Sequence, residues 1–128
     1  MKVLLDSHAL LWWLFDSPKL SVTARALISD RSNTVLVSAA SAWEIATKHR
    51  LGKLPEATVL LGDFSGWIEK AAFNELPISI SHARRAGSWP QPHRDPFDRM
   101  LAAQSAEENI PLLSVDEAQK AFGVMLLW

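Results

Sequence analysis

Short apolar runs alternate along the chain with longer segments whose apolar residues recur at helical spacing. We expect strands at 3–5, 34–37, 76–79, 111–113 and 124–127, the last of them at a sheet edge. We expect helices at 9–15, 21–29, 39–51, 64–73, 81–88, 97–108 and 116–121. Short continuous apolar strands are typical of a parallel sheet buried on both faces. The alternation predicts an α/β fold, a three-layer α/β/α sandwich around a central, mainly parallel sheet, in one domain spanning 1–128.

Composition narrows the class of protein. Hydrophobic residues make up 48% of the chain and charged residues 21%, which is typical of a globular domain. The absence of cysteine excludes disulfides, thiolate metal sites and cysteine nucleophiles. No apolar stretch is long enough to span a bilayer, and the apolar start is interrupted by Asp6 and His8 without a cleavage signal. We therefore expect a cytoplasmic protein without membrane contact.

Four carboxylates follow strand-like runs or open helices: Asp6, Glu44, Asp98 and Asp116. In an open α/β sheet, the carboxyl ends of parallel strands form the edge where ligands bind. Two carboxylates about 5 Å apart repel by roughly 3 kcal/mol at an effective dielectric constant of about 20. A divalent cation relieves this repulsion, and oxygen ligands suit Mg²⁺ or Mn²⁺. The pattern therefore predicts a metal-dependent enzyme.

Each acidic residue also has a purely structural explanation. Ser41 and Glu44 fit a capping box at a helix start. Asp95 fits a helix N-cap before a proline, with Asp98 as an acidic residue in the first turn. Asp116 fits a cap as well. Capping explains each position alone but does not explain why all of them would meet at one edge of the sheet.

Three segments, DSHALLWWL, VSAASAWEIATKHRLGKL and HRDPFDRMLAAQSAEENIPLLSVD, resemble PIN-domain ribonucleases, and more narrowly the VapC toxins of toxin–antitoxin pairs. The resemblance runs over essentially the whole chain. It implies the PIN α/β/α sandwich and an acidic site at Asp6, Glu44, Asp98 and Asp116. Ser7 and Ser114 stand where the family usually has threonine, so they keep the supporting hydroxyl groups.

The chemistry that the resemblance implies is hydrolysis of RNA with one or two Mg²⁺ ions, or Mn²⁺. Asp6 and Asp98 are the expected direct metal ligands. Glu44 and Asp116 would complete the site directly or through water, because Mg²⁺ keeps several waters. Asp95 is expected to be the helix cap.

Substrate contacts are expected from local basic residues, because a net charge of −1 gives no uniformly positive surface. Lys48, Arg94 and Arg99 lie near the acidic residues in sequence and are candidate phosphate contacts. For the two arginines, a salt bridge to Asp95 or Asp98 is an equally good explanation.

The chain has six tryptophans, which are candidates for the core, for stacking on RNA bases and for contacts with partner proteins. Trp43 is expected in the core, and Trp89, in a proline-rich loop, is the expected RNA-stacking residue. The resemblance implies a homodimer and an antitoxin bound in an apolar groove, for which Trp13 and Leu14 are candidates.

Three alternatives stay open at this point. The chain could be a PIN ribonuclease of RNA processing without an antitoxin, or a non-catalytic PIN-like module that binds RNA or protein. A metal-free ribonuclease would instead use histidines such as His8 and His93 as acid–base groups.

Overall fold

The computed structural model describes all residues from Met1 to Trp128. Its centre is a five-stranded sheet in the order β3-β2-β1-β4-β5, with every neighbouring pair parallel. The strands are β1 (Lys2–Leu5), β2 (Thr34–Ser38), β3 (Asn74–Leu76), β4 (Leu112–Leu113) and β5 (Leu126–Leu127). Strand β1 lies in the middle of the sheet, and β5 is at one edge, as expected. All carboxyl ends therefore meet at a single edge.

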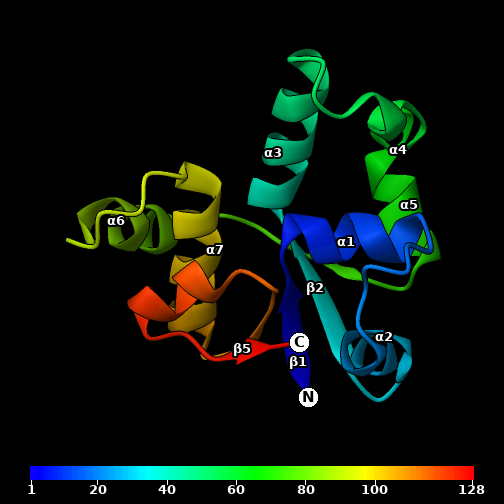
Figure 1. Ribbon diagram of the computed structural model, residues 1–128. Helices are drawn as coiled ribbons and strands as arrows, with labels where there is room; N and C mark the ends of the chain where they lie inside the picture. The colour runs from blue at the N-terminus through cyan, green and yellow to red at the C-terminus, as the bar shows by residue number, and fades with distance from the viewer.

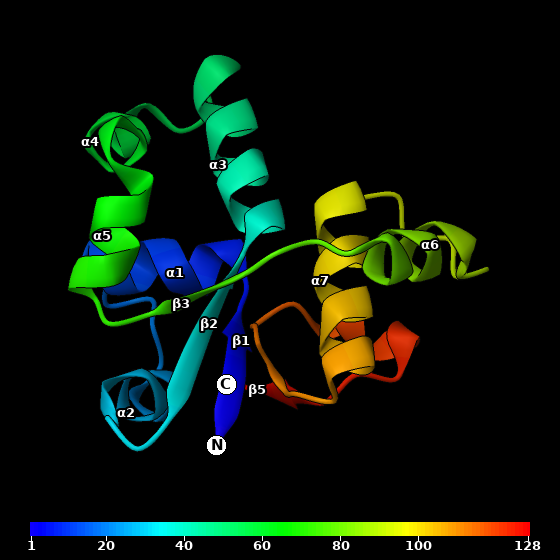
Figure 2. The same ribbon diagram turned by 180° about the vertical axis from the view of Figure 1, so that it is seen from behind.

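Helices cover both faces of the sheet, as the views from the two sides show (Figures 1 and 2). The α-helices are α1 (Ser7–Leu14), α2 (Val22–Ser29), α3 (Ala39–Arg50), α4 (Thr58–Gly62), α5 (Phe64–Lys70), α6 (Ile80–Ser88) and α7 (Pro96–Glu108). Two 3₁₀ helices are η1 (Pro55–Ala57) and η2 (Glu117–Phe122). One face carries α1, α2 and α5, and the other carries α6 and α7. This arrangement confirms the predicted α/β/α sandwich.

The alternation of side chains along β1 explains the two hydrophobic layers. Val3 and Leu5 belong to the larger buried cluster, on the side of α1 and α2. Leu4 points to the opposite face, where it packs with Leu101 of α7 and with Leu112. All three β1 side chains are fully buried. A strand buried on both faces needs an uninterrupted apolar sequence, and the run VLL supplies it.

Helix α3 leaves the carboxyl end of β2 and projects beyond the sheet (Figure 1). The Ser38 hydroxyl caps its start by accepting the Ala40 N–H. The helix ends where expected, because Gly52 follows it in the left-handed conformation, with φ of 76°. The position of α3 brings its first two turns next to the start of α1 and of α7.

Two parts of the fold differ from the expectation. Strand β3 covers Asn74–Leu76 and not 76–79, because Pro77 lacks an N–H group and ends the pairing with β2. The strand has little apolar character and is defined by its backbone hydrogen bonds. The helices η1 and α4 were not expected, and the helix predicted at 64–73 ends at Lys70. No helix is long and apolar enough to cross a membrane.

Candidate active site

Asp6 lies at the point where the central strand β1 turns into α1. It is the N-cap of α1, and its Oδ1 accepts the backbone N–H of Ala9 at 2.7 Å. The residue is buried, with 6% of its surface exposed. Burial raises the pKa of Asp6 above its ordinary value, and hydrogen bonds from Ser114 and Ala9 only partly offset this effect. The carboxylate is therefore both a cap and a desolvated acid at the carboxyl edge of the sheet.

Glu44 is held in place by one side chain from α1 and one from its own helix. Its Oε1 accepts the Ser7 hydroxyl at 2.6 Å, and its Oε2 lies 2.6 Å from Nζ of Lys48. The Ser7 hydroxyl lies 3.1 Å from that of Ser41. The predicted capping box is therefore wrong: Ser38, not Ser41, caps α3, and Glu44 returns no bond to the helix start.

Asp95 and Asp98 open α7 after a proline-rich loop. As expected, Asp95 is the N-cap, and its Oδ1 accepts the N–H groups of Phe97 and Asp98. Pro96 stands at the first helical position, where a missing N–H costs nothing. With the Asp95 carboxylate satisfying the helix end, the Asp98 side chain is free to point away from its own helix.

Asp98 is a second acid of the site whose pKa is raised. Burial, and then the negative charges of the other acids, raise its pKa to about 7. In falling order of effect, these charges belong to Asp95, Glu44, Asp116 and Asp6. Like charges disfavour ionisation only at short range, so these contributions show that carboxylates from four separate segments meet. We call Asp6, Glu44, Asp95, Asp98 and Asp116 the acidic cluster.

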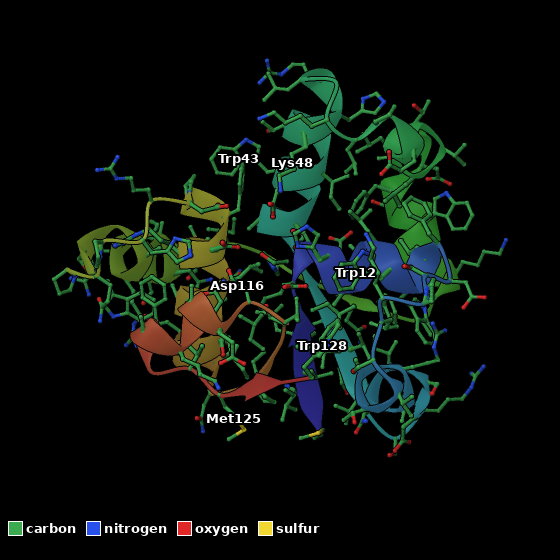
Figure 3. The ribbon with its side chains drawn as sticks, viewed as in Figure 1. Trp12, Trp43, Lys48, Asp116, Met125 and Trp128 are labelled. Carbon is green, nitrogen blue, oxygen red and sulfur yellow. The ribbon has the colours of Figure 1, made fainter.

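Asp116 lies beyond the end of β4 and faces the middle of the molecule (Figure 3). It caps η2 by accepting the Ala118 N–H, as the structural explanation predicted. The buried Ser114 hydroxyl accepts the Asp116 N–H. Both explanations of Asp116 therefore hold together: the residue caps a helix and belongs to the acidic cluster.

His93 joins the acidic cluster from the loop before α7. Its Nε2 lies 3.3 Å from Oδ2 of Asp98, and ligand atoms of His93, Asp98 and Asp116 all lie within 4.8 Å of one another. The buried Nε2 has no hydrogen-bond partner. An orphaned nitrogen beside crowded carboxylates fits a bound cation, and the mostly oxygen donor set fits Mg²⁺ or Mn²⁺. Asp6, an expected direct ligand, is not part of this closest group.

The three candidate phosphate contacts have different surroundings. Arg94 is exposed and forms no ion pair. Lys48 is paired with Glu44, whose hydrogen bond and charge raise the pKa of the ammonium although desolvation acts to lower it. Arg99 donates to the carbonyls of four residues of the preceding helix and loop: Ala86, Trp89, Gln91 and His93. The expected phosphate clamp at Arg99 therefore has almost no free donors, and the expected salt bridges to Asp95 and Asp98 are absent.

The tryptophans are placed differently from the expectation. Trp43 is 56% exposed, so its predicted place in the core is wrong. Trp89, the expected RNA-stacking residue, is half-buried and stacks on Phe122 at 4.8 Å between ring centroids. Trp13 is half-buried against the core cluster, with its ring 6.4 Å from that of Phe73. An apolar pocket lies between α1, α4 and α5, lined by Leu14, Phe15, Val59, Leu60 and Trp67.

The sequence matches a known protein family over almost its whole length. The model of the PIN domain matches residues 3–124, almost the whole chain. The chain belongs to the PIN-domain family. Its four acidic segments occupy the carboxyl edge of the PIN sheet, as the resemblance implied.

Relatives of this PIN domain include named proteins of Mycobacterium tuberculosis. Ribonuclease VapC16 is 38% identical over 81 residues, which cover 57% of this chain and 56% of that protein, so the chain spans little more than half of it. Ribonuclease VapC22 is 27% identical over 117 residues, or 89% of this chain and 86% of that protein. The resemblance to VapC proteins is confirmed.

Solved structures share the fold. VapC20 of M. tuberculosis superposes with a TM-score of 0.71 at 14% identity, covering 96% of each chain. A VapBC2 structure from Rickettsia felis gives a TM-score of 0.70 at 13% identity and covers 99% of this chain and 98% of that one. At such low identity, these structures support the PIN architecture alone.

Two members of the site escaped sequence reasoning. The role of Ser41 beside Ser7 was hidden because S-x-x-E is also a capping signature. His93 was one of four histidines without distinguishing spacing. Its place two residues before the Asp95 cap is the one sequence signal that could have drawn attention to it.

Proposed function

We propose that this PIN domain is a divalent-metal-dependent endoribonuclease. The observation that carries the proposal is the crowding of carboxylates from four segments around Asp98, where burial and the neighbouring charges raise the pKa to about 7. Strongly perturbed pKa values of buried acids cluster at functional sites. Ribonuclease is also the activity named for the relatives VapC16 and VapC22.

The metal would be Mg²⁺ or Mn²⁺, held by Asp98 and Asp116 with Asp6 and Glu44 completing the site directly or through water. When bound, such an ion supplies a Lewis acid that polarises the phosphodiester and activates a water molecule. Other side chains of the protein orient the carboxylates of the site. Ser7 fixes the orientation of Glu44 through a 2.6 Å hydrogen bond.

The surrounding residues tune this site. The Lys48 ammonium, 2.6 Å from Glu44, offsets part of the negative charge that would repel a phosphate. Arg99 ties down the loop that positions His93, because it donates to the His93 carbonyl. Arg94 is exposed and free to contact phosphate. Arg99 is thus a positioning residue in this proposal.

The test replaces a single 2′-hydroxyl by hydrogen at the cleaved nucleotide of an RNA oligonucleotide. Attack by an external water does not need this hydroxyl, so cleavage of the 2′-deoxy substrate should continue, and cleavage of unmodified RNA should leave no 2′,3′-cyclic phosphate. The metal-free acid–base route with His8 or His93 attacks through the 2′-oxygen. Complete loss of cleavage on the 2′-deoxy substrate, or a 2′,3′-cyclic phosphate product from unmodified RNA, would contradict the proposal.

We also propose that the protein is a dimeric toxin neutralised by an antitoxin. Solved PIN structures that share the fold include VapBC assemblies and the toxin–antitoxin complex from Klebsiella pneumoniae. The apolar pocket around Leu14 offers a site for a partner's side chain. The product of a small gene beside this one should bind and stop cleavage. Val59→Glu, at a 69% exposed position of the pocket, should weaken this inhibition without lowering RNA cleavage; full inhibition of the variant would remove the pocket from the interface.

A further inference from the structure

Trp43 is the one large apolar side chain of α3 that faces solvent, with 56% of its surface exposed. The other five tryptophans of the chain are all partly buried. In Figure 3 it extends from α3 towards the start of α7. Single exposed apolar residues are common on protein surfaces, so exposure alone assigns no role. The surroundings of the ring are more informative.

The Trp43 ring meets Phe97 edge to face, with ring centroids 4.8 Å apart and planes at 80°. Phe97 is partly buried, so it supports one side of the indole. The pair joins α3 to α7, the two helices in which the next residues, Glu44 and Asp98, belong to the acidic cluster. On each helix the aromatic residue is therefore one position away from a carboxylate of the cluster, and more than half of the surface of Trp43 is exposed.

A flat aromatic ring beside a phosphodiester-cleaving site suits a nucleobase. Unpaired bases stack on aromatic side chains without regard to sequence, because every base has a π-face. An RNA substrate must place its scissile phosphate at the acidic cluster. The base next to that phosphate then lies within reach of Trp43. Lys48, one helical turn beyond Glu44, adds positive charge on the same helix.

We propose that Trp43, supported by Phe97, is a base-stacking subsite for the unpaired nucleotide next to the scissile phosphodiester. This inference rests on the proposed ribonuclease function and adds that the substrate is single-stranded at this position. The subsite acts on binding and positioning and takes no part in the chemical step.

The experiment measures single-turnover cleavage of one RNA by the wild type, Trp43→Ala and Trp43→Phe. Trp43→Ala should raise the RNA concentration for half-maximal rate by roughly 5- to 150-fold, the range found for loss of one base–aromatic stack, and leave the maximal rate nearly unchanged. Trp43→Phe should keep most of the affinity. Val22→Ala is the control, because Val22 is 88% exposed at the start of α2, outside every site described above, and should change neither quantity.

A second substrate tests the contact itself. RNA with an abasic nucleotide next to the cleaved bond should bind the wild type as weakly as intact RNA binds Trp43→Ala. The affinity of Trp43→Ala for the abasic RNA should be no lower than that of the wild type. Additive losses, or unchanged affinity of Trp43→Ala for intact RNA, would overturn the subsite. A variant that instead lowers dimerisation or antitoxin binding, at unchanged RNA affinity, would assign Trp43 to a protein interface.

Tryptophan fluorescence separates this inference from the proposed function. A stacked base quenches the indole, so RNA should quench wild-type fluorescence, and the part due to Trp43 should vanish in Trp43→Phe. Quenching that depends on Trp43 without any cleavage would keep the subsite and refute the ribonuclease. Cleavage without quenching or loss of affinity in the variants would refute the subsite alone.

Discussion

Asp98→Asn should make the metal-free protein more stable while it destroys the site. The pKa of Asp98 rises from 3.8 to about 7 on folding, first through burial and then through the charges of Asp95, Glu44, Asp116 and Asp6. A rise of about three units corresponds to about 4 kcal/mol of lost stability once the group is ionised. Since the side chain is 22% exposed, we expect a gain of about 2 to 4 kcal/mol at pH 8.

The sign of the pH dependence follows from the direction of the shift. Because the folded-state pKa is raised, the neutral form of Asp98 is favoured in the native protein and carries no penalty below about pH 4. The penalty grows between pH 4 and 7 and is complete above pH 7. The stability difference between Asp98→Asn and the wild type should therefore vanish near pH 4 and reach its maximum at pH 8.

Thermal and urea unfolding in EDTA measure this difference, with an expected rise in Tm of roughly 10 °C at pH 8. Asp30→Asn is the matched control: hydrogen bonds from Ser32 lower the pKa of this exposed carboxyl, so its amide should not stabilise the protein. Saturating Mg²⁺ should stabilise the wild type and not Asp98→Asn. Equal stability of the two proteins at pH 8, or a gain that persists at pH 4, would refute the electrostatic account of the site.

Three further substitutions test the parts around the metal site. Ser7→Ala removes the donor to Glu44 and should lower kcat/KM and Mg²⁺ affinity roughly 10- to 100-fold, as measured by kinetics and calorimetry, with wild-type values arguing against an orienting role. Arg99→Lys loses most of the hydrogen bonds to backbone carbonyls and should speed limited proteolysis of the loop before α7. An unchanged rate of proteolysis would show that these bonds do not hold the loop. Arg94→Ala should lower the slope of log affinity against log salt by roughly 0.7 for single-stranded RNA, and an unaltered slope would mean that Arg94 touches no phosphate.

The sheet and the positions of the carboxylates could be predicted because both depend on strong local patterns. Buried parallel strands need continuous apolar runs, so β1 and β2 stand out, and parallel strands align their carboxyl ends. Strand β3 did not stand out because its residues Asn74 and Glu75 are exposed and only its backbone pairs with β2. The pattern of apolar and polar residues therefore does not reveal an edge strand of this kind.

The details of the site depend on contacts between distant segments, which local patterns do not specify. Ser7 and Glu44 are 37 positions apart, and their hydrogen bond excludes the capping role that the S-x-x-E spacing suggested. The apolar character of the helix predicts a buried Trp43, yet α3 projects beyond the sheet and leaves Trp43 56% exposed. The orientation of a helix relative to its neighbours decides which of its apolar residues face solvent.

The most direct test of the account is single-turnover cleavage of a labelled RNA by the wild type and by Glu44→Gln, first in EDTA and then after Mg²⁺ is added in excess. We expect no cleavage by either protein in EDTA and full recovery of the wild type with Mg²⁺. With Mg²⁺, Glu44→Gln should cleave at least about 100-fold more slowly than the wild type. Cleavage by the wild type that continues undiminished in EDTA, or a Glu44→Gln variant as active as the wild type, would contradict a carboxylate-held metal site.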